Sequence, residues 1–190
     1  MSKKHIITLG GLPGSGKSTV KRLLTETLSY QSFSTGDFAR SLAVGRGISL
    51  EEFNALVTHD KSLDIHIDEE QTRIGKEEDK YIIDSILGFH FIPESFKIHL
   101  SVPVEVSAQR IFGDKNSALR LASQDSPETF KETLEKTIRR IENHKERYLN
   151  HYGVHIYDED NFDLVIDTST KTPNEVAELI LNEYQNWLHN

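Results

Sequence analysis

The sequence predicts an α/β fold in which a doubly wound, five-stranded parallel sheet carries helices on both faces. Two observations lead to this prediction. Short apolar runs alternate along the chain with segments whose apolar residues recur at helical spacing. The first run, Ile6–Leu9, is almost continuously apolar, as expected of a strand that is buried on both faces of a parallel sheet. Because ligands of such folds bind at the carboxyl ends of the strands, the segments that follow the strands are the expected binding positions.

The segment after the first strand matches the phosphate-loop pattern G-x-x-x-x-G-K-[ST]. Glycines let successive backbone N–H groups converge on one anion, and the helix that follows adds the positive end of its dipole. Lys17 can reach the outer phosphates, and the Ser18 hydroxyl can ligate Mg²⁺. We therefore expect a nucleoside triphosphate with Mg²⁺ at this loop. Its expected binding residues are Gly11, Leu12, Pro13, Gly14, Ser15, Gly16, Lys17, Ser18 and Thr19.

Four further strands are expected, because each is a short apolar or alternating run. They are Gln31–Ser34, Lys80–Asp84, Lys97–Val102 and Phe162–Thr168. A helix over 17–29 follows the first strand, and its amphipathic pattern predicts one buried face. The residues of that face are Val20, Leu23, Leu24 and Leu28.

Capping residues mark the helices between the second and third strands. Asp37 can cap a helix that starts at Phe38, although the same carboxylate could equally serve a ligand. Ser49 with Glu52 matches a capping box, so the next helix starts there. A third helix is expected over about 62–74.

Three more helices complete the predicted fold. A proline suits the first turn of one that runs from 103 to about 112, and a long helix follows from 126 to about 150. The last begins at 172. Its predicted apolar stripe is Val176, Leu179, Ile180, Tyr184 and Leu188, and that of the long helix includes Leu134, Ile138 and Ile141.

Two segments have compositions that suit mobile parts of an enzyme. The helices within 36–80 are polar and read as an insert that packs over the sheet edge and closes on an acceptor. The stretch 113–128 is rich in Gly, Asp, Asn, Ser and Gln, which suits a lid. We expect both segments to belong to a single domain, 1–190.

Charged side chains are predicted to gather at the carboxyl edge of the sheet. Asp84 ends the third strand, where a carboxylate holds the hydration shell of Mg²⁺ in phosphate-loop enzymes. Arg40, one turn into its helix, is placed to grip a second phosphate. The second half of the long helix is basic, and the pattern leaves open whether it is a solvated face or a charge clamp beside a triphosphate. Its cations are Arg139, Arg140, Lys145 and Arg147.

Composition restricts the class of protein. The chain has 190 residues, of which 36% are hydrophobic and 27% charged, with a net charge of −8. This acidic balance disfavours a nucleic-acid partner. The absence of cysteine excludes thiolate catalysis and disulfides, and no apolar run is long enough for a signal peptide or a membrane span. We expect a cytoplasmic monomer that binds small-molecule nucleotides and no membrane.

The chain resembles the P-loop nucleoside monophosphate kinases, and most closely the archaeal-type cytidylate kinases. The resemblance covers nearly the whole length and rests on segments 11–19, 34–40, 47–53, 106–111, 147–154 and 162–168. It implies transfer of the γ-phosphoryl group of ATP to CMP or dCMP. It also implies that the acceptor site includes Ser34, Asp37 and Arg40, and that catalysis involves Lys17, Arg110, Arg140 and Arg147.

Two departures keep other functions open. The segment 84–89 lacks the arginine that the family carries there for the acceptor phosphate, and Asp114 stands near the place of a second lid arginine. One alternative is therefore a P-loop kinase for another small molecule. The other is a non-catalytic protein that binds ATP. A GTPase is disfavoured, because neither an N-K-x-D nor a D-x-x-G motif follows the third strand.

Overall fold

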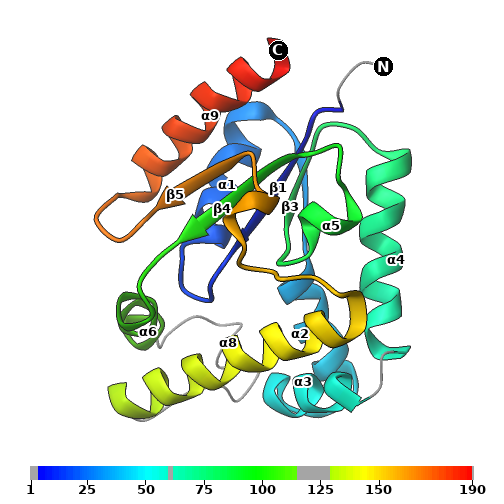
Figure 1. Cartoon of the computed structure of the whole chain (residues 1–190), viewed down its shortest axis with the longest axis vertical. Helices are drawn as coiled ribbons and strands as arrows, with labels where there is room; N and C mark the ends of the chain where they lie inside the picture. The colour runs from blue at the N-terminus through cyan, green and yellow to red at the C-terminus, as the bar shows by residue number, and fades with distance from the viewer. Residues whose placement is uncertain (1–3, 60–61, 115–128, 190) are drawn as a thin grey trace.

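The computed structural model describes residues 4–59, 62–114 and 129–189 (Figure 1). Its centre is one sheet in which every strand pairing is parallel, in the order β2-β3-β1-β4-β5. The strands are β1 Ile6–Gly11, β2 Gln31–Ser34, β3 Tyr81–Asp84, β4 Phe96–Ser101 and β5 Leu164–Asp167. The predicted five-stranded parallel fold is thus confirmed, with strand ends within two residues of the expected positions.

Helices surround the sheet on both faces and at the ends of the strands (Figure 1). They are α1 Lys17–Leu28, α2 Thr35–Gly45, α3 Leu50–His59, α4 Ser62–Glu77, α5 Gly88–Phe91, α6 Val104–Gly113, α8 Phe130–Tyr152 and α9 Pro173–His189, with a short 3₁₀ turn at Glu159–Asn161. Helix α8 lies beyond the end toward which the strands point, and both chain ends lie on the opposite side.

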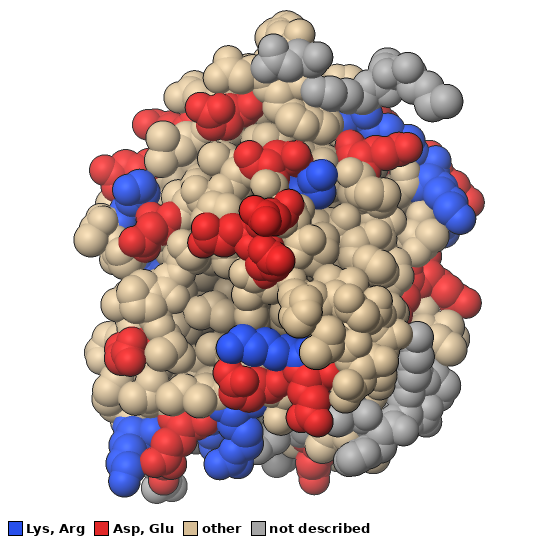
Figure 2. All heavy atoms as spheres, in the orientation of Figure 1, with Lys and Arg blue, Asp and Glu red and all other residues tan. Residues whose placement is uncertain are grey.

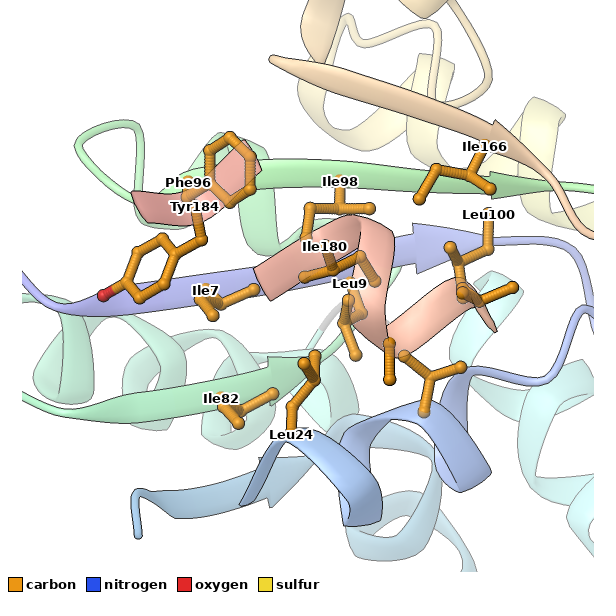
Figure 3. Close-up of a cluster of buried hydrophobic side chains, with 13 residues drawn as sticks. Ile7, Leu9, Leu24, Ile82, Phe96, Ile98, Leu100, Ile166, Ile180 and Tyr184 are labelled. Atoms are coloured by element: carbon orange, nitrogen blue, oxygen red, sulfur yellow. The ribbon is translucent and has the colours of Figure 1, made fainter. Parts of the chain in front are cut away.

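The main core lies between the sheet and the helices α1 and α9 (Figure 3). Alternate strand residues point to this side, as the period of two in a strand requires. The strand residues of this core are Ile7, Leu9, Ile82, Phe96, Ile98, Leu100 and Ile166, and the helices add Val20, Leu24, Val176, Ala177, Ile180 and Tyr184. The predicted stripe of α9 is wrong at one position, because Leu179 is 41% exposed and Ala177 is buried instead.

The other face of the sheet is covered by α4 and α5. Ile6 and Ile83 pack there against Ile74 of α4 and against Ile92, which follows α5. Helix α5 is not among the helices expected from the sequence. Gly88 lets this turn approach the sheet, since a Cβ at that position would lie 3.0 Å from the Thr8 side chain.

Helix α2 begins earlier than expected and uses a different cap. It starts at Thr35, and the Ser34 side chain is the N-cap, accepting a hydrogen bond of 3.3 Å from the Asp37 backbone N–H. The prediction that Asp37 caps a helix starting at Phe38 is therefore wrong. Asp37 lies instead in the first helical turn, where its carboxylate is free to pair with other side chains.

Helix α8 turns a polar face inward. Its buried residues are Thr133, Thr137, Ile141, His144 and Arg147. Ile138, expected on the apolar stripe, is 44% exposed. Because a helix that seals a core buries apolar residues, this polar buried face indicates that α8 borders a cleft.

On the face seen in Figure 2, charge is spread rather than concentrated in one patch. Figure 2 shows acidic side chains on the upper and lower parts of one face, with basic side chains interspersed among them. Among the described residues, no helix is both long and apolar enough to cross a bilayer.

Candidate active site

The phosphate loop is shaped by glycines in conformations that other residues rarely adopt. Gly14 and Gly16 have φ angles of 74° and 93°. A Cβ on Gly14 would lie 2.7 Å from the Ser107 carbonyl oxygen, whereas one on Gly16 would enter open space. The loop is also anchored from outside, because the Ser107 hydroxyl donates to the Pro13 carbonyl. Gly16 is the N-cap of α1, so the unpaired N–H groups of that helix are available to an anion.

Lys17 folds back over this loop. Its Nζ donates to the carbonyl oxygens of Gly11 at 3.0 Å and Leu12 at 2.7 Å, and reaches Ser15 Oγ at 3.5 Å. Burial lowers the pKa of Lys17, the negative charge of Asp84 raises it, and the positive charge of Arg140 lowers it further. The ammonium group therefore sits between a carboxylate and a second cation.

Ser18 and Asp84 come together as the sequence predicts. The Ser18 hydroxyl donates to Asp84 Oδ2 at 3.3 Å, and Asp84 is only 7% exposed. A hydroxyl and a carboxylate beside a phosphate site are the oxygen donors that Mg²⁺ uses when phosphates and waters complete its shell. The donor set therefore fits Mg²⁺, although no group of three or more His, Asp or Glu side chains forms a metal cluster within the described ranges.

A pocket next to the residues that follow Asp84 lies between the helices of the 36–80 segment and α8. It encloses about 80 Å³. One side of the pocket is formed by residues of α2, α3 and α4. They are Thr35, Gly36, Ala39, Leu50, Phe53, Asn54, Ile67, Asp68 and Gln71. The segment after β3 adds Ser85, Ile86 and Leu87, and α8 adds Arg140, His144, Arg147 and Tyr148.

Two of the predicted catalytic arginines therefore line one pocket. Arg147 is 6% exposed, donates to the Tyr148 hydroxyl at 2.5 Å and lies 4.5 Å from the centre of that ring. Arg140 precedes Arg147 on the same face of α8 and is half-buried. Arg139 and Lys145 are exposed, so the basic half of α8 divides into a solvated side and a pocket side.

Arg40 lies beside this pocket rather than in its wall. Its guanidinium donates to Asp37 Oδ1 at 2.5 Å and sits 3.6 Å from the position of a Cβ on Gly36. Burial raises the pKa of Asp37, but the hydrogen bond and charge of Arg40 and the charge of Lys21 outweigh it and hold the pKa below its usual value. Ser34, the third predicted acceptor residue, is 7% exposed and serves as the α2 cap.

Arg110 takes a different position from the other arginines. It reaches from α6 to the loop after β5, where it donates to the Thr168 hydroxyl at 3.0 Å and to the Thr168 carbonyl at 2.5 Å. Thr168 in turn donates to the Ser15 carbonyl at 3.2 Å. The structure thus ties Arg110 to the phosphate loop and does not bring it into the pocket with Arg140. The lid predicted at 113–128 falls, beyond Asp114, outside the described residues.

Two pocket residues escaped the sequence prediction. Gln71 is 1% exposed and accepts a hydrogen bond of 2.5 Å from the Ser85 hydroxyl. His144 is 5% exposed on the inner face of α8. Their signal in the sequence is weak, because a lone polar residue at an inward helical position is visible only once the neighbouring elements are placed.

Comparison with known proteins agrees with this geometry. A family profile described as an AAA domain matches residues 7–131. The cytidylate kinase of Sulfolobus acidocaldarius is 37% identical over 92% of this chain and 91% of its own. A relative named S-adenosylmethionine-dependent nucleotide dehydratase, from Lacinutrix mariniflava, is 35% identical over 96% of this chain, which spans only 36% of that protein.

Solved structures support the fold. The shikimate kinase of Bacteroides thetaiotaomicron superposes with a TM-score of 0.62 over 97% of this chain and 98% of its own, at 11% identity. The P-loop kinase relatives support nucleotide kinase activity. The chain belongs to the P-loop nucleoside monophosphate kinase family and is close to the archaeal cytidylate kinases.

Proposed function

We propose that the protein transfers the γ-phosphoryl group of ATP to a nucleoside monophosphate, CMP or dCMP, and releases the diphosphate and ADP. One observation carries the proposal. The hydrogen-bonded pair of Ser18 and Asp84 joins the phosphate loop to the end of β3, and the residues that follow Asp84 line a pocket whose wall contains two arginines. Two anionic ligands held on either side of this pair would meet there, which is the arrangement that phosphoryl transfer between nucleotides needs.

The phosphate loop is the proposed donor site. Residues 11–19 bind the ATP phosphates through backbone N–H groups, and Lys17 exchanges its bonds to Gly11 and Leu12 for phosphate oxygens. Ser18 and Asp84 hold Mg²⁺, which neutralises charge on the phosphates when bound. Arg110 positions the loop after β5 against the phosphate loop.

The pocket between the 36–80 insert and α8 is the proposed acceptor site. Arg40 binds the acceptor phosphate, and Ser34 and Asp37 line the acceptor site beside it. Arg140 and Arg147, in the pocket wall, neutralise charge on the transferred group. Cations around the equatorial oxygens stabilise charge in the transition state, and they need no covalent chemistry. Closure of the insert and of the lid over 113–128 would exclude water and limit hydrolysis of ATP.

The test is a coupled assay of ADP release with ATP, Mg²⁺ and a panel of CMP, dCMP, UMP, AMP and GMP. We expect strong stimulation by CMP and dCMP over the rate with ATP alone. Stimulation by a purine monophosphate only would contradict the proposed acceptor and leave the kinase class in place.

A second candidate is a P-loop kinase for another small acceptor. The observation that favours it is the segment after Asp84, which presents Ser85, Ile86 and Leu87 to the pocket and no arginine. That candidate predicts no stimulation by any monophosphate of the panel but turnover with a different phosphate acceptor. A protein that only binds ATP would show saturable binding in calorimetry and no turnover with any acceptor.

A further inference from the structure

His144 is a buried group in the pocket that neither the family resemblance nor the comparisons assign. It lies on the inner face of α8, one turn before Arg147 and one turn after Arg140, and is 5% exposed. Its Nδ1 is buried and lacks a hydrogen-bond partner among the described residues. The ring packs against Tyr148, with the ring centres 5.8 Å apart. A buried polar atom in a pocket wall without a partner indicates that a ligand supplies one.

The charges around this imidazole are mainly positive. Burial lowers its pKa well below the usual value, and the positive charges of Arg140, Arg147 and Lys17 lower it further. The acidic side chain that lines the same pocket is Asp68 of α4, and its carboxylate accepts a hydrogen bond from Tyr152. His144 is therefore neutral near pH 7, although the carboxylate of Asp84 also acts on Lys17 and raises the pKa of that cation.

We propose that His144 hydrogen-bonds the phosphate of the acceptor and takes up a proton from solvent as that phosphate enters. A dianionic phosphate in the pocket beside Arg140 and Arg147 offsets much of the positive charge that keeps the ring neutral. The ring then gains a second N–H donor, aimed at the anion that made its protonation favourable. No covalent bond changes, and the proton comes from the buffer. The inference rests on the proposed function, because it needs a phosphate-bearing acceptor in this pocket.

A cationic His144 would also supply positive charge that the segment after Asp84, which has no arginine, does not provide. The β3 side of the pocket offers Ile86 and Leu87, which cannot hold an anion. The α8 side offers two arginines and a histidine that becomes cationic when the phosphate binds. A histidine at this position binds the phosphate without adding a fourth permanent charge to an already crowded buried cluster.

The experiment is calorimetric titration with CMP at about pH 6.5, in buffers of different ionisation enthalpy, which yields the number of protons taken up. It compares the wild type with His144→Gln, and His66→Gln serves as the matched control because His66 is 71% exposed. We expect the wild type and His66→Gln to take up about half to one proton more per CMP than His144→Gln. Proton release from the CMP phosphate itself cancels in this difference.

The outcomes separate the inference from the proposed function. Equal proton numbers in wild type and His144→Gln, with CMP bound by both, would overturn the inference and leave the kinase proposal intact. If neither the wild type nor the two variants bind CMP or any other monophosphate, the proposed function fails and the inference fails with it.

A second measurement keeps the inference testable if His144→Gln does not fold. Histidine C2–H resonances of the wild-type protein, followed through pH with and without CMP, should include one buried ring that becomes protonated only in the complex. A spectrum in which every histidine titrates identically with and without CMP would contradict the proposal. Kinetics add a third readout, which is the KM for CMP of His144→Gln divided by that of the wild type. This ratio should fall as pH rises, because His144 of the wild type then stays neutral and loses its advantage over glutamine.

Discussion

Replacing Arg147 by Met separates the proposed role of the α8 cations from a role in folding. Arg147 is 6% exposed in the pocket wall. Its positive charge acts on His144, as do the charges of Arg140 and Lys17. Methionine fills a similar length of side chain without the charge. The substitution therefore removes one buried cation from the place where a phosphate is proposed to bind, and it leaves the apolar packing of α8 largely unchanged.

The expected loss follows from the interactions of a buried guanidinium with an anion. A charge-assisted hydrogen bond contributes about 1.5–3 kcal/mol, and removing one preorganised donor from a transition state costs about 2.7–4 kcal/mol. We therefore expect a loss of about 3 kcal/mol, which is a fall in kcat/KM for CMP of about a hundredfold. Stability should change by less than about 1 kcal/mol, since the lost bond to Tyr148 is offset by relief of repulsion from Arg140, which lines the same pocket.

The assay is steady-state ADP release with ATP, Mg²⁺ and varied CMP, together with thermal unfolding of the same samples. Arg139→Met is the matched control, because it removes the same charge from the exposed side of the same helix. Its turnover should stay within about twofold of the wild type. Equal losses in Arg139→Met and Arg147→Met would mean that general surface charge matters and that the pocket assignment is wrong. An unchanged rate in Arg147→Met would remove Arg147 from the site.

Four further substitutions probe the donor side and the core. Lys17→Met should lower kcat by about 10²–10³ with a near-normal melting temperature, and a rate within tenfold of wild type would contradict its role. Gly14→Ala should cost about 2–4 kcal/mol of stability, because its Cβ meets the Ser107 carbonyl at 2.7 Å, while Gly16→Ala should cost only about 1–2 kcal/mol and weaken ATP binding. Denaturant unfolding that ranks them the other way round would refute this reasoning. His99 has a pKa lowered to about 4 by burial and by Lys17, so the unfolded chain binds the proton more tightly. Its contribution is complete above about pH 6.5 and is lost as pH falls toward 4, by up to about 3 kcal/mol. His99→Phe should flatten that part of the stability curve, and parallel curves would argue against it.

The sheet and the phosphate loop were predictable because their signals are local. A buried parallel strand is a continuous apolar run, and the loop is a fixed spacing of glycines, lysine and serine. The partnership of Ser18 with Asp84 also followed, because carboxyl ends of parallel strands share one edge.

Features that depend on a choice between local alternatives were less predictable. Ser34 and Asp37 are both good caps three residues apart, and the strand that ends at Ser34 decides between them. Periodicity likewise could not choose between Ala177 and Leu179, because that choice depends on how α9 is rotated against α1.

The pocket beside α8 was the least predictable part. Sequence patterns mark the faces that helices turn to a core, whereas α8 turns Thr137, His144 and Arg147 to a cleft. The sequence left open whether the basic half of α8 is solvated or a clamp. The structure places Arg139 and Lys145 on the exposed side of the helix and Arg140 and Arg147 on the pocket side. Gln71 and His144 belong to the pocket only because distant segments meet there.

The most direct measurement follows the γ-phosphate itself. Incubation of the protein with γ-labelled ATP, Mg²⁺ and CMP should move the label into the β-position of CDP, one CDP for each ADP, and Lys17→Met should slow the transfer by about 10²–10³. Label released only as inorganic phosphate, or ADP formed without any labelled diphosphate, would contradict an acceptor held beside the donor across Asp84.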